Sequence, residues 1–251
     1  MKNILVVSAS SDIGCAVVKN YYKDNFITAT YRSKNDNILS VAENENTRIA
    51  YLDLEYDYSI EKFSETMGEW DLCFCCVGEP LPIGPFFDTD FSEWQKSVAV
   101  NSILQLKLIH KIKDRASKDA SVVFFGSGGT NKSIKDFSAY TIGKTILCKA
   151  AELIAEENPS MRVFVFGPGW VYSKMHERIY NKLTHSKEWK DKTKEIVERG
   201  MSQNEYGDLL SKIDTILNLP PELVSGKNFC ITDDVDEIQA GKDLYKFRRL
   251  T

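Results

Sequence analysis

Tyr140 and Lys144 stand one helical turn apart in the run Tyr-Thr-Ile-Gly-Lys. This spacing places a phenol and an ammonium on one face of a helix. A phenol can give a proton to a carbonyl oxygen on which negative charge develops. An ammonium roughly 4 Å from the ionised phenol stabilises it by on the order of 4 kcal/mol at an effective dielectric constant near 20. This energy corresponds to a pKa lowered by about three units. The pair therefore predicts a general acid whose pKa is lowered toward neutrality.

The spacing alone arises by chance, and a second pair in this chain shows what a chance match looks like. Tyr58 and Lys62 have the same separation, but Glu45 occupies the position thirteen residues upstream, where Ser127 precedes Tyr140. Neither an apolar run nor a small-residue turn leads into Tyr58. We therefore interpret Tyr58 and Lys62 as solvated helix surface, and the interpretation of Tyr140 depends on its neighbours in the sequence.

Two predicted elements position the Tyr140 pair. Residues 122–125 are Val-Val-Phe-Phe and are followed by Gly-Ser-Gly-Gly, which predicts a buried parallel strand closed by a turn. Residues 138–155 carry apolar side chains at helical intervals. The tip of the strand therefore delivers the hydroxyl of Ser127 toward the helix that bears Tyr140.

The rest of the chain repeats this alternation of strand and helix. Strand-like runs at residues 4–7, 26–30, 48–52, 72–77 and 161–166 are interspersed with helical stretches, among them 12–22 and 91–112. Such alternation predicts right-handed βαβ units, and hence an α/β fold with a doubly wound, mostly parallel, Rossmann-like sheet. No repeat or linker divides the 251 residues. We expect one domain over residues 1–251, with ligands bound beyond the carboxyl ends of the strands.

Composition excludes several other classes of protein. A chain with 43% hydrophobic and 27% charged residues is ordinary for a globular protein, and its net charge of −4 argues against a nucleic-acid partner. No apolar stretch approaches the roughly eighteen residues of a membrane helix, so we expect no membrane partner and a cytoplasmic location. Six Cys without a secretory signal predict reduced thiols. The cluster of Cys73, Cys75 and Cys76 lacks a second pair of ligands, so no metal site is expected.

A cofactor site is predicted at the ends of the first two strands. Residues 7–14, Val-Ser-Ala-Ser-Ser-Asp-Ile-Gly, would let backbone amides and a helix N-terminus approach a pyrophosphate. A helix cap explains Ser11 and Asp12 as well, so the loop alone leaves both interpretations open. The second strand ends in Thr-Tyr-Arg-Ser, where an NAD-binding sheet normally offers an acid to the ribose. Arg32 suits a 2′-phosphate instead, so NADP(H) is preferred and NAD(H) is the alternative.

Together these motifs resemble the short-chain dehydrogenase/reductase family, in its single-domain form. Residues 8–14 look like the family's glycine-rich loop, although Ser and Asp stand where it usually has glycine. The residues that fall in the order and spacing of its catalytic tetrad are Asn101, Ser127, Tyr140 and Lys144. Asp53 resembles the acid that meets the adenine, and Pro168-Gly169 resembles the segment that leads into the substrate loop. The resemblance covers nearly the whole chain.

The resemblance implies a role for each of these residues. Tyr140 would donate the proton, Ser127 would hold the oxyanion, and Lys144 would hydrogen-bond the nicotinamide ribose. Asn101 would hold a water that connects Lys144 to solvent; the alternative for Asn101 is a polar residue on an exposed helix face. The residues expected to bind the cofactor are Ser8, Ser10, Ser11, Asp12, Ile13, Gly14, Arg32, Asp53, Leu54, Cys76, Val77, Gly78, Tyr140, Lys144, Pro168, Gly169, Val171 and Ser173.

These inferences predict an NADP(H)-dependent oxidoreductase that interconverts a carbonyl and an alcohol by hydride transfer. Residues 168–203 follow a predicted strand and are rich in Lys and Arg, which favours a lid over a small polar substrate, such as a sugar derivative or a phosphorylated metabolite. A catalytically silent NADP-binding regulator and a nucleotide-sugar epimerase or dehydratase are the alternatives. The family resemblance also implies a homodimer or homotetramer formed through residues 91–112 and 138–155.

Overall fold

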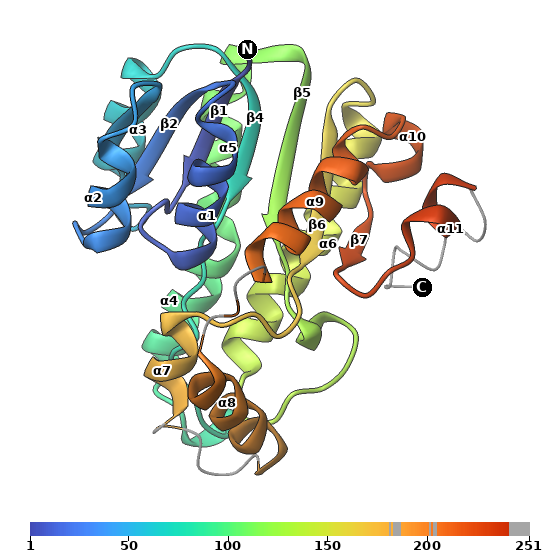
Figure 1. Cartoon of the computed structure of the whole chain (residues 1–251). Helices are drawn as coiled ribbons and strands as arrows, with labels where there is room; N and C mark the ends of the chain where they lie inside the picture. The colour runs from blue at the N-terminus through green and yellow to red at the C-terminus, as the bar shows by residue number, and fades with distance from the viewer. Residues whose placement is uncertain (181, 183–186, 201, 203–204, 241–251) are drawn as a thin grey trace.

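A seven-stranded parallel sheet forms the centre of the molecule (Figure 1). The computed structural model describes residues 1–240 except 181, 183–186, 201 and 203–204. The strand order is β3-β2-β1-β4-β5-β6-β7. The strands are β1 (Asn3–Val7), β2 (Phe26–Tyr31), β3 (Thr47–Tyr51), β4 (Trp70–Cys75), β5 (Ala116–Phe125), β6 (Arg162–Gly167) and β7 (Asn228–Cys230). The predicted doubly wound, Rossmann-like, single-domain α/β fold is confirmed.

Helices cover both faces of the sheet, which explains why its strands are apolar on both sides. In β1, Ile4 and Val6 belong to one core cluster, whereas Leu5 and Val7 belong to the other. Successive side chains of a strand point to opposite faces, so a strand buried on both faces needs a continuous apolar run.

The first cluster also contains residues of α1 (Asp12–Tyr21), α2 (Asp36–Ala42), α9 (Glu205–Leu217), α10 (Pro221–Val224) and α11 (Val235–Gln239). The second contains residues of α3 (Asp57–Thr66), α5 (Ile103–Ile112) and α6 (Ser138–Glu157).

The predicted helical stretch at residues 91–112 is divided in two. α4 (Phe91–Asn101) ends and α5 begins on either side of Ser102, whose φ and ψ are −148° and −80°. The hydroxyl of Ser102 donates to the carbonyl oxygen of Val98 at 2.6 Å, and this kind of bond to the preceding turn bends helices. The break leaves Asn101 at the end of α4, beside the sheet.

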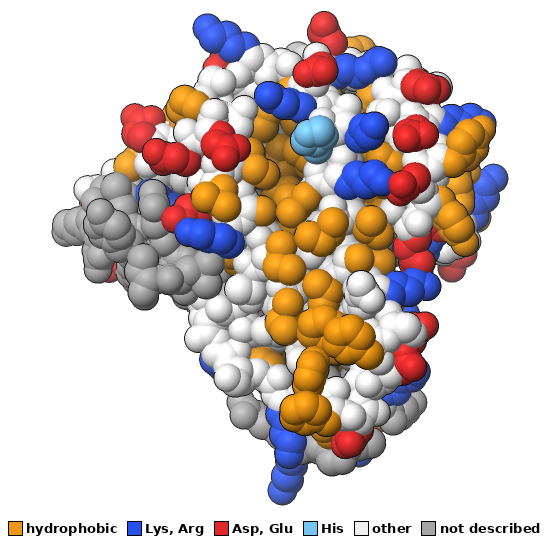
Figure 2. All heavy atoms as spheres, turned by 180° about the vertical axis from the view of Figure 1, so that it is seen from behind, with side chains coloured by type: hydrophobic (Ala, Val, Ile, Leu, Met, Phe, Trp, Pro, Cys, Tyr) orange, Lys and Arg blue, Asp and Glu red, His pale blue; other side chains and the backbone are white. Residues whose placement is uncertain are grey.

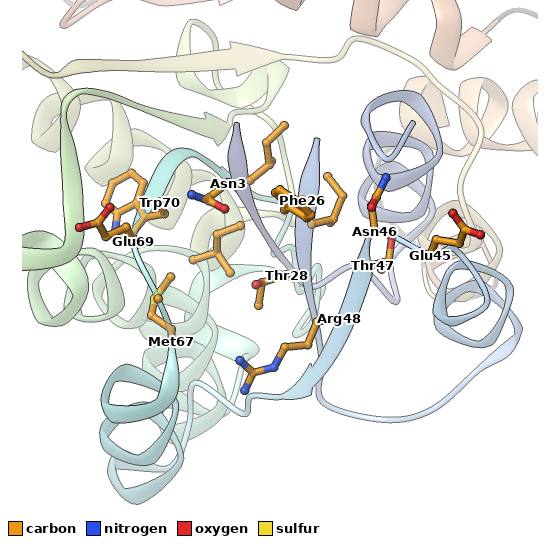
Figure 3. A pocket seen from close by; sticks show the side chains of 14 residues that line it. Asn3, Phe26, Thr28, Glu45, Asn46, Thr47, Arg48, Met67, Glu69 and Trp70 are labelled. Atoms are coloured by element: carbon orange, nitrogen blue, oxygen red, sulfur yellow. The ribbon is translucent and has the colours of Figure 1, made fainter. Parts of the chain in front are cut away.

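The carboxyl ends of the strands all point to one edge of the sheet. In Figure 1 the arrows point toward the part of the molecule that holds α7 (Lys174–Tyr180) and α8 (Lys187–Arg199). A different pocket, of about 360 Å³, lies at the opposite edge (Figure 3). Its lining includes the first residues of four strands, namely Asn3, Phe26, Thr47 and Trp70. None of the predicted site residues lines that pocket.

None of the described helices is both long enough and apolar enough to cross a bilayer. The three clustered cysteines Cys73, Cys75 and Cys76 are buried, and the sulfur atoms of Cys73 and Cys75 lie 3.9 Å apart inside the second core cluster. Cys73 and Cys75 therefore pack as core side chains.

Candidate active site

Two cavities adjoin one another at the carboxyl edge of the sheet. The first, of about 310 Å³, lies between the turn after β1, the end of β5, α6 and α7. The second, of about 190 Å³, lies between the turn after β1, the ends of β2 and β3, and the segment after β4. The residues that line both are Ser8, Ser10, Ser11, Val77, Gly78 and Arg178. The pair of cavities therefore follows the edge where such sheets bind ligands.

Most of the predicted cofactor residues meet in these cavities. The first is also lined by Asp12, Ile13, Cys76, Tyr140, Lys144, Pro168 and Ser173, and the second by Arg32, Asp53 and Leu54. Gly14, Gly169 and Val171 line neither cavity in the described part of the chain. Val171 is instead a core residue, 8% exposed, and a Cβ added at Gly169 would lie 2.7 Å from Cγ2 of Ile231. Val171 and Gly169 therefore contribute to packing and do not line either cavity.

The turn after β1 bends tightly into α1, although Ser8 and Asp12 stand where the glycine-rich loop that it resembles usually has glycine. Ser8 has a φ of 64°, in the left-handed region that glycine adopts most readily. A Cβ added at Gly14 would lie 2.3 Å from the carbonyl oxygen of Ser8, so this position requires glycine. The hydroxyl of Ser11 accepts from the Gly14 amide at 3.1 Å and donates to the Ser8 carbonyl at 2.7 Å, which fixes the turn and caps α1.

Asp12 occupies the second position where glycine is usual, and its carboxylate is turned to other partners. One oxygen accepts from the backbone amide of Lys174 at 2.7 Å, at the start of α7. The other accepts from the Asn37 side chain at 2.9 Å. Asp12 therefore joins the turn after β1 to α7, and a negative charge at a helix N-terminus is favourable.

Tyr140 and Lys144 both line the first cavity, and the ammonium of Lys144 lies at the ring of Tyr140. Nζ of Lys144 lies 5.6 Å from the centre of the Tyr140 ring and donates to the carbonyl oxygen of Val77 at 2.8 Å. Burial raises the pKa of Tyr140 to about 12 and lowers the pKa of Lys144 to about 8. The predicted lowering of the Tyr140 pKa is therefore wrong for this conformation, because desolvation acts on the phenol and no charge compensates it.

Asn101 is fully buried, so its interpretation as a polar residue on an exposed helix face is wrong. Its side-chain nitrogen donates to the carbonyl oxygen of Glu79 at 2.7 Å and to that of Ser97 at 2.9 Å. Its side-chain oxygen accepts from the amide of Glu79 at 3.0 Å. Asn101 thus fixes the backbone just after Val77 and Gly78, two residues that line both cavities.

Ser127 lies one residue beyond the cavity lining at the end of β5. Phe125 and Gly126 line the first cavity, whereas Ser127 begins a short turn and its hydroxyl accepts from the amide of Gly129 at 3.2 Å. A Cβ added at Gly129 would lie 2.6 Å from Oγ1 of Thr141 on α6. This close approach holds the turn against the helix that carries Tyr140.

Arg32 lies at the second cavity as predicted, but it has a protein partner that the sequence did not suggest. Its guanidinium lies 3.0 Å from a carboxylate oxygen of Glu55, and the ammonium of Lys96 lies 2.9 Å from the other oxygen. Both cations are more than half exposed. Buried Asp53 accepts from the amide of Glu55 at 3.0 Å and thereby positions it. The pocket at this end of the groove is therefore lined by charges of both signs, namely the cations Arg32, Lys96 and Arg178 and the acids Glu55, Glu79 and Glu93.

The segment expected to form a lid contains α7 and α8, with residues 181, 183–186, 201 and 203 outside the described part. α7 contacts the groove directly. A Cβ added at Gly78 would lie 2.9 Å from Cε of Met175, and Arg178 forms an ion pair with Glu79 at 3.1 Å. Met175 also packs in a small apolar cluster with Phe137, Ile179 and Trp189. Motif reasoning missed Glu55, Glu79, Lys96 and Arg178, because no local pattern marks a residue whose partner is distant in sequence.

The sequence matches a family model described as enoyl-(acyl carrier protein) reductase over residues 7–210. A comparison with curated proteins gives no match. Among solved structures, a short chain dehydrogenase/reductase from Saccharomyces cerevisiae has a TM-score of 0.79 at 19% identity, covering 98% of this chain and 99% of that chain.

An angucycline C-6 ketoreductase with bound NADP has a TM-score of 0.75 at 15% identity, covering 92% and 93%. A protein described as a short chain dehydrogenase from Shigella flexneri, complexed with NADP, has a TM-score of 0.76 at 16% identity, covering 92% and 97%.

Proposed function

The chain belongs to the short-chain dehydrogenase/reductase family of oxidoreductases, and from this premise we propose that it uses NADP(H) to interconvert a carbonyl and an alcohol. The observation that carries the proposal is the joint lining of one cavity by the residues of the glycine-type loop and by Tyr140 and Lys144. When bound, the nicotinamide cofactor supplies the hydride. The chain's own residues must hold the cofactor, orient the carbonyl and supply the proton.

The groove fits a dinucleotide at several points. The backbone at Ser8 and Gly14 leaves no room for a Cβ at residue 14, as expected where a loop turns tightly into a helix beneath a pyrophosphate. Asp53 and Leu54 line the far cavity, where the adenosine would lie. Arg32 and Lys96, which share the carboxylate of Glu55, supply two cations for a 2′-phosphate, and this favours NADP(H) over NAD(H). The NADP bound to two similar structures supports the same preference.

Tyr140 is the proposed proton donor and Ser127 the proposed holder of the developing oxyanion. Because burial raises the pKa of Tyr140 to about 12, the phenol is protonated at neutral pH and has a proton to give. This state suits reduction of a ketone. Lys144 is held at the ring of Tyr140 by the carbonyl of Val77, close to the place proposed for the nicotinamide ribose. Asn101 fixes the adjoining backbone and thereby the wall of the cavity.

A small polar substrate, sugar-derived or phosphorylated, is proposed from the excess of Lys and Arg in residues 174–199. The structure gives an observation for a second class. Met175 lines the cavity together with Ile13 and Phe125, so an apolar ketone would find apolar side chains there. A panel of polar and apolar ketones, scored by kcat/KM with NADPH, separates the two classes.

A homodimer or homotetramer through α4, α5 and α6 is also part of the proposal. Several large apolar side chains of these helices are exposed, among them Phe91, Ile103, Ile142 and Leu153. Figure 2 shows a broad run of hydrophobic side chains on the reverse face of the molecule. Exposed apolar patches of this kind mark contact surfaces. Sedimentation velocity of the purified chain measures the assembly state directly.

The replacement Tyr140→Phe tests the proposed chemistry. Loss of the hydroxyl should reduce NADPH oxidation with the best ketone of the panel by roughly a thousandfold, because no proton is delivered. NADPH affinity, measured by fluorescence titration, should stay nearly unchanged. The matched control is Tyr58→Phe, which removes the same atom from an exposed tyrosine with the same Lys spacing.

The alternatives give other outcomes. If the protein is a silent regulator, both the wild type and Tyr140→Phe bind NADPH, and neither oxidises it with any ketone of the panel. An epimerase or dehydratase converts a nucleotide sugar without net NADPH oxidation. Retained turnover in Tyr140→Phe would remove Tyr140 from the mechanism.

A further inference from the structure

Arg178 of α7 lies where the two cavities of the groove meet. It lines both of them, together with five uncharged residues, which are Ser8, Ser10, Ser11, Val77 and Gly78. Arg178 is thus the one charged residue among the described residues that line both cavities. A dinucleotide that occupies both cavities must cross this junction with its pyrophosphate, which lies between its two nucleosides.

Arg178 forms only a weak ion pair, with Glu79. Its guanidinium lies 3.1 Å and 3.4 Å from the two carboxylate oxygens of Glu79, and its side chain is 52% exposed. The Glu79 side chain is 23% exposed. An ion pair with one half-exposed partner contributes little stability, so the guanidinium can exchange the carboxylate for another anion at small cost. A planar guanidinium binds phosphate oxygens in a two-pronged way, and a pyrophosphate carries more charge than one carboxylate.

The position of α7 is fixed independently of this ion pair. The carboxylate of Asp12 accepts from the amide of Lys174, which holds the first turn of α7 against the cofactor loop. Arg178 stands one helical turn after Lys174, so it lies on the same side of the helix. The contact between Met175 and Gly78 supports the same placement.

We propose that Arg178 binds the pyrophosphate of the cofactor and that Glu79 is its resting partner, from which the cofactor displaces it. This inference rests on the proposed use of NADP(H). It gives α7 a part in cofactor binding, and it supplies the positive charge that the uncharged residues at the junction lack.

The test compares Arg178→Gln and Glu79→Gln with the control Arg48→Gln, which makes the same substitution at an exposed arginine of β3. NADPH and the fragment 2′-AMP, which has the 2′-phosphate but no pyrophosphate, are titrated against each protein. Arg178→Gln should weaken NADPH binding roughly tenfold or more and leave 2′-AMP binding unchanged. Glu79→Gln should tighten NADPH binding about twofold to fivefold, because the competing carboxylate is gone.

Two outcomes overturn the inference while leaving the proposed function intact. The first is wild-type affinity for NADPH in both Arg178→Gln and Glu79→Gln. The second is an equal loss of 2′-AMP and NADPH affinity in Arg178→Gln, which would place the guanidinium at the 2′-phosphate. The inference also predicts a gain of NADPH affinity in Glu79→Gln. A folding defect in Arg178→Gln would therefore not reproduce both results. If the wild type binds no NADPH, the proposed function fails and this inference fails with it.

Discussion

The buried ammonium of Lys144 should leave a measurable signature in the pH dependence of stability. Burial lowers its pKa from 10.5 to about 8, so the folded protein binds fewer protons than the unfolded chain between these values. Stability therefore rises with pH across this window, and the cost of the buried charge is fully present below it. A shift of this size corresponds to a cost of about 3 kcal/mol in the folded state below about pH 8.

The replacement Lys144→Met removes the titrating group while keeping much of its volume. Between about pH 7 and pH 9, the wild type should gain about 1 kcal/mol of unfolding free energy relative to Lys144→Met. The lost hydrogen bond to the Val77 carbonyl costs the variant about 1 to 3 kcal/mol, but this cost does not depend on pH. Burial raises the pKa of Cys148 to about 12, and its opposing effect is present in both proteins.

Urea unfolding at a series of pH values, followed by tryptophan fluorescence and circular dichroism together, measures this difference. Lys149→Met is the matched control, because Lys149 follows on the same helix and its side chain is 57% exposed. The stability of Lys149→Met relative to the wild type should not change over the same range. A constant difference between the wild type and Lys144→Met would refute the reasoning, since it would mean that burial does not perturb the ammonium.

Two further predictions concern the cofactor end of the groove. Arg32→Ala should weaken NADPH binding about tenfold and leave NADH binding nearly unchanged, as measured by fluorescence titration, because only NADPH carries the phosphate that Arg32 would meet; equal losses for both cofactors would contradict this role. Gly14→Ala should lower the unfolding free energy by about 2 kcal/mol in urea and weaken NADPH binding, because its Cβ would lie 2.3 Å from the Ser8 carbonyl. The control Gly68→Ala, where a Cβ would meet nothing within 4 Å, should leave both quantities near wild type.

The fold was predictable because both faces of the central strands are apolar. Runs such as residues 4–7 and 122–125 carry no polar residue, and only a sheet covered on both sides buries such runs. The last strand gave no such signal. β7 has only the three residues Asn-Phe-Cys, and its pairing with β6 depends on tertiary position. The same limit applied to Ser102, whose bond to the preceding turn divides a helix with an unbroken apolar pattern.

Residues of the candidate site were predictable where the chain itself brings them together. Tyr140 and Lys144 share one helix, and residues 8–14 form one turn, so spacing was enough to group each set. The partners of Arg32 and Arg178 were not predictable, because Glu55 and Glu79 reach them from other elements. The pKa of Tyr140 was wrongly predicted for a related reason. Spacing fixed which residues are neighbours, whereas the carbonyl of Val77, from a distant strand end, decided where the ammonium lies.

Ser8 and Asp12 stand where glycine is usual, and this departure motivated the alternative of a silent regulator. The structure weakens that argument. Ser8 adopts the left-handed backbone that glycine would give, and the cost is one strained residue of about 1 kcal/mol. Asp12 points its carboxylate at the amide of Lys174 and at Asn37, so its charge stabilises the start of α7. Asp12 therefore helps to position α7 and, with it, Arg178. A glycine at residue 12 has no carboxylate and could not hold the helix by this bond. Asp12 thus ties the loop to α7, and the residues at positions 8 and 12 do not by themselves favour a regulator that binds NADP without turnover.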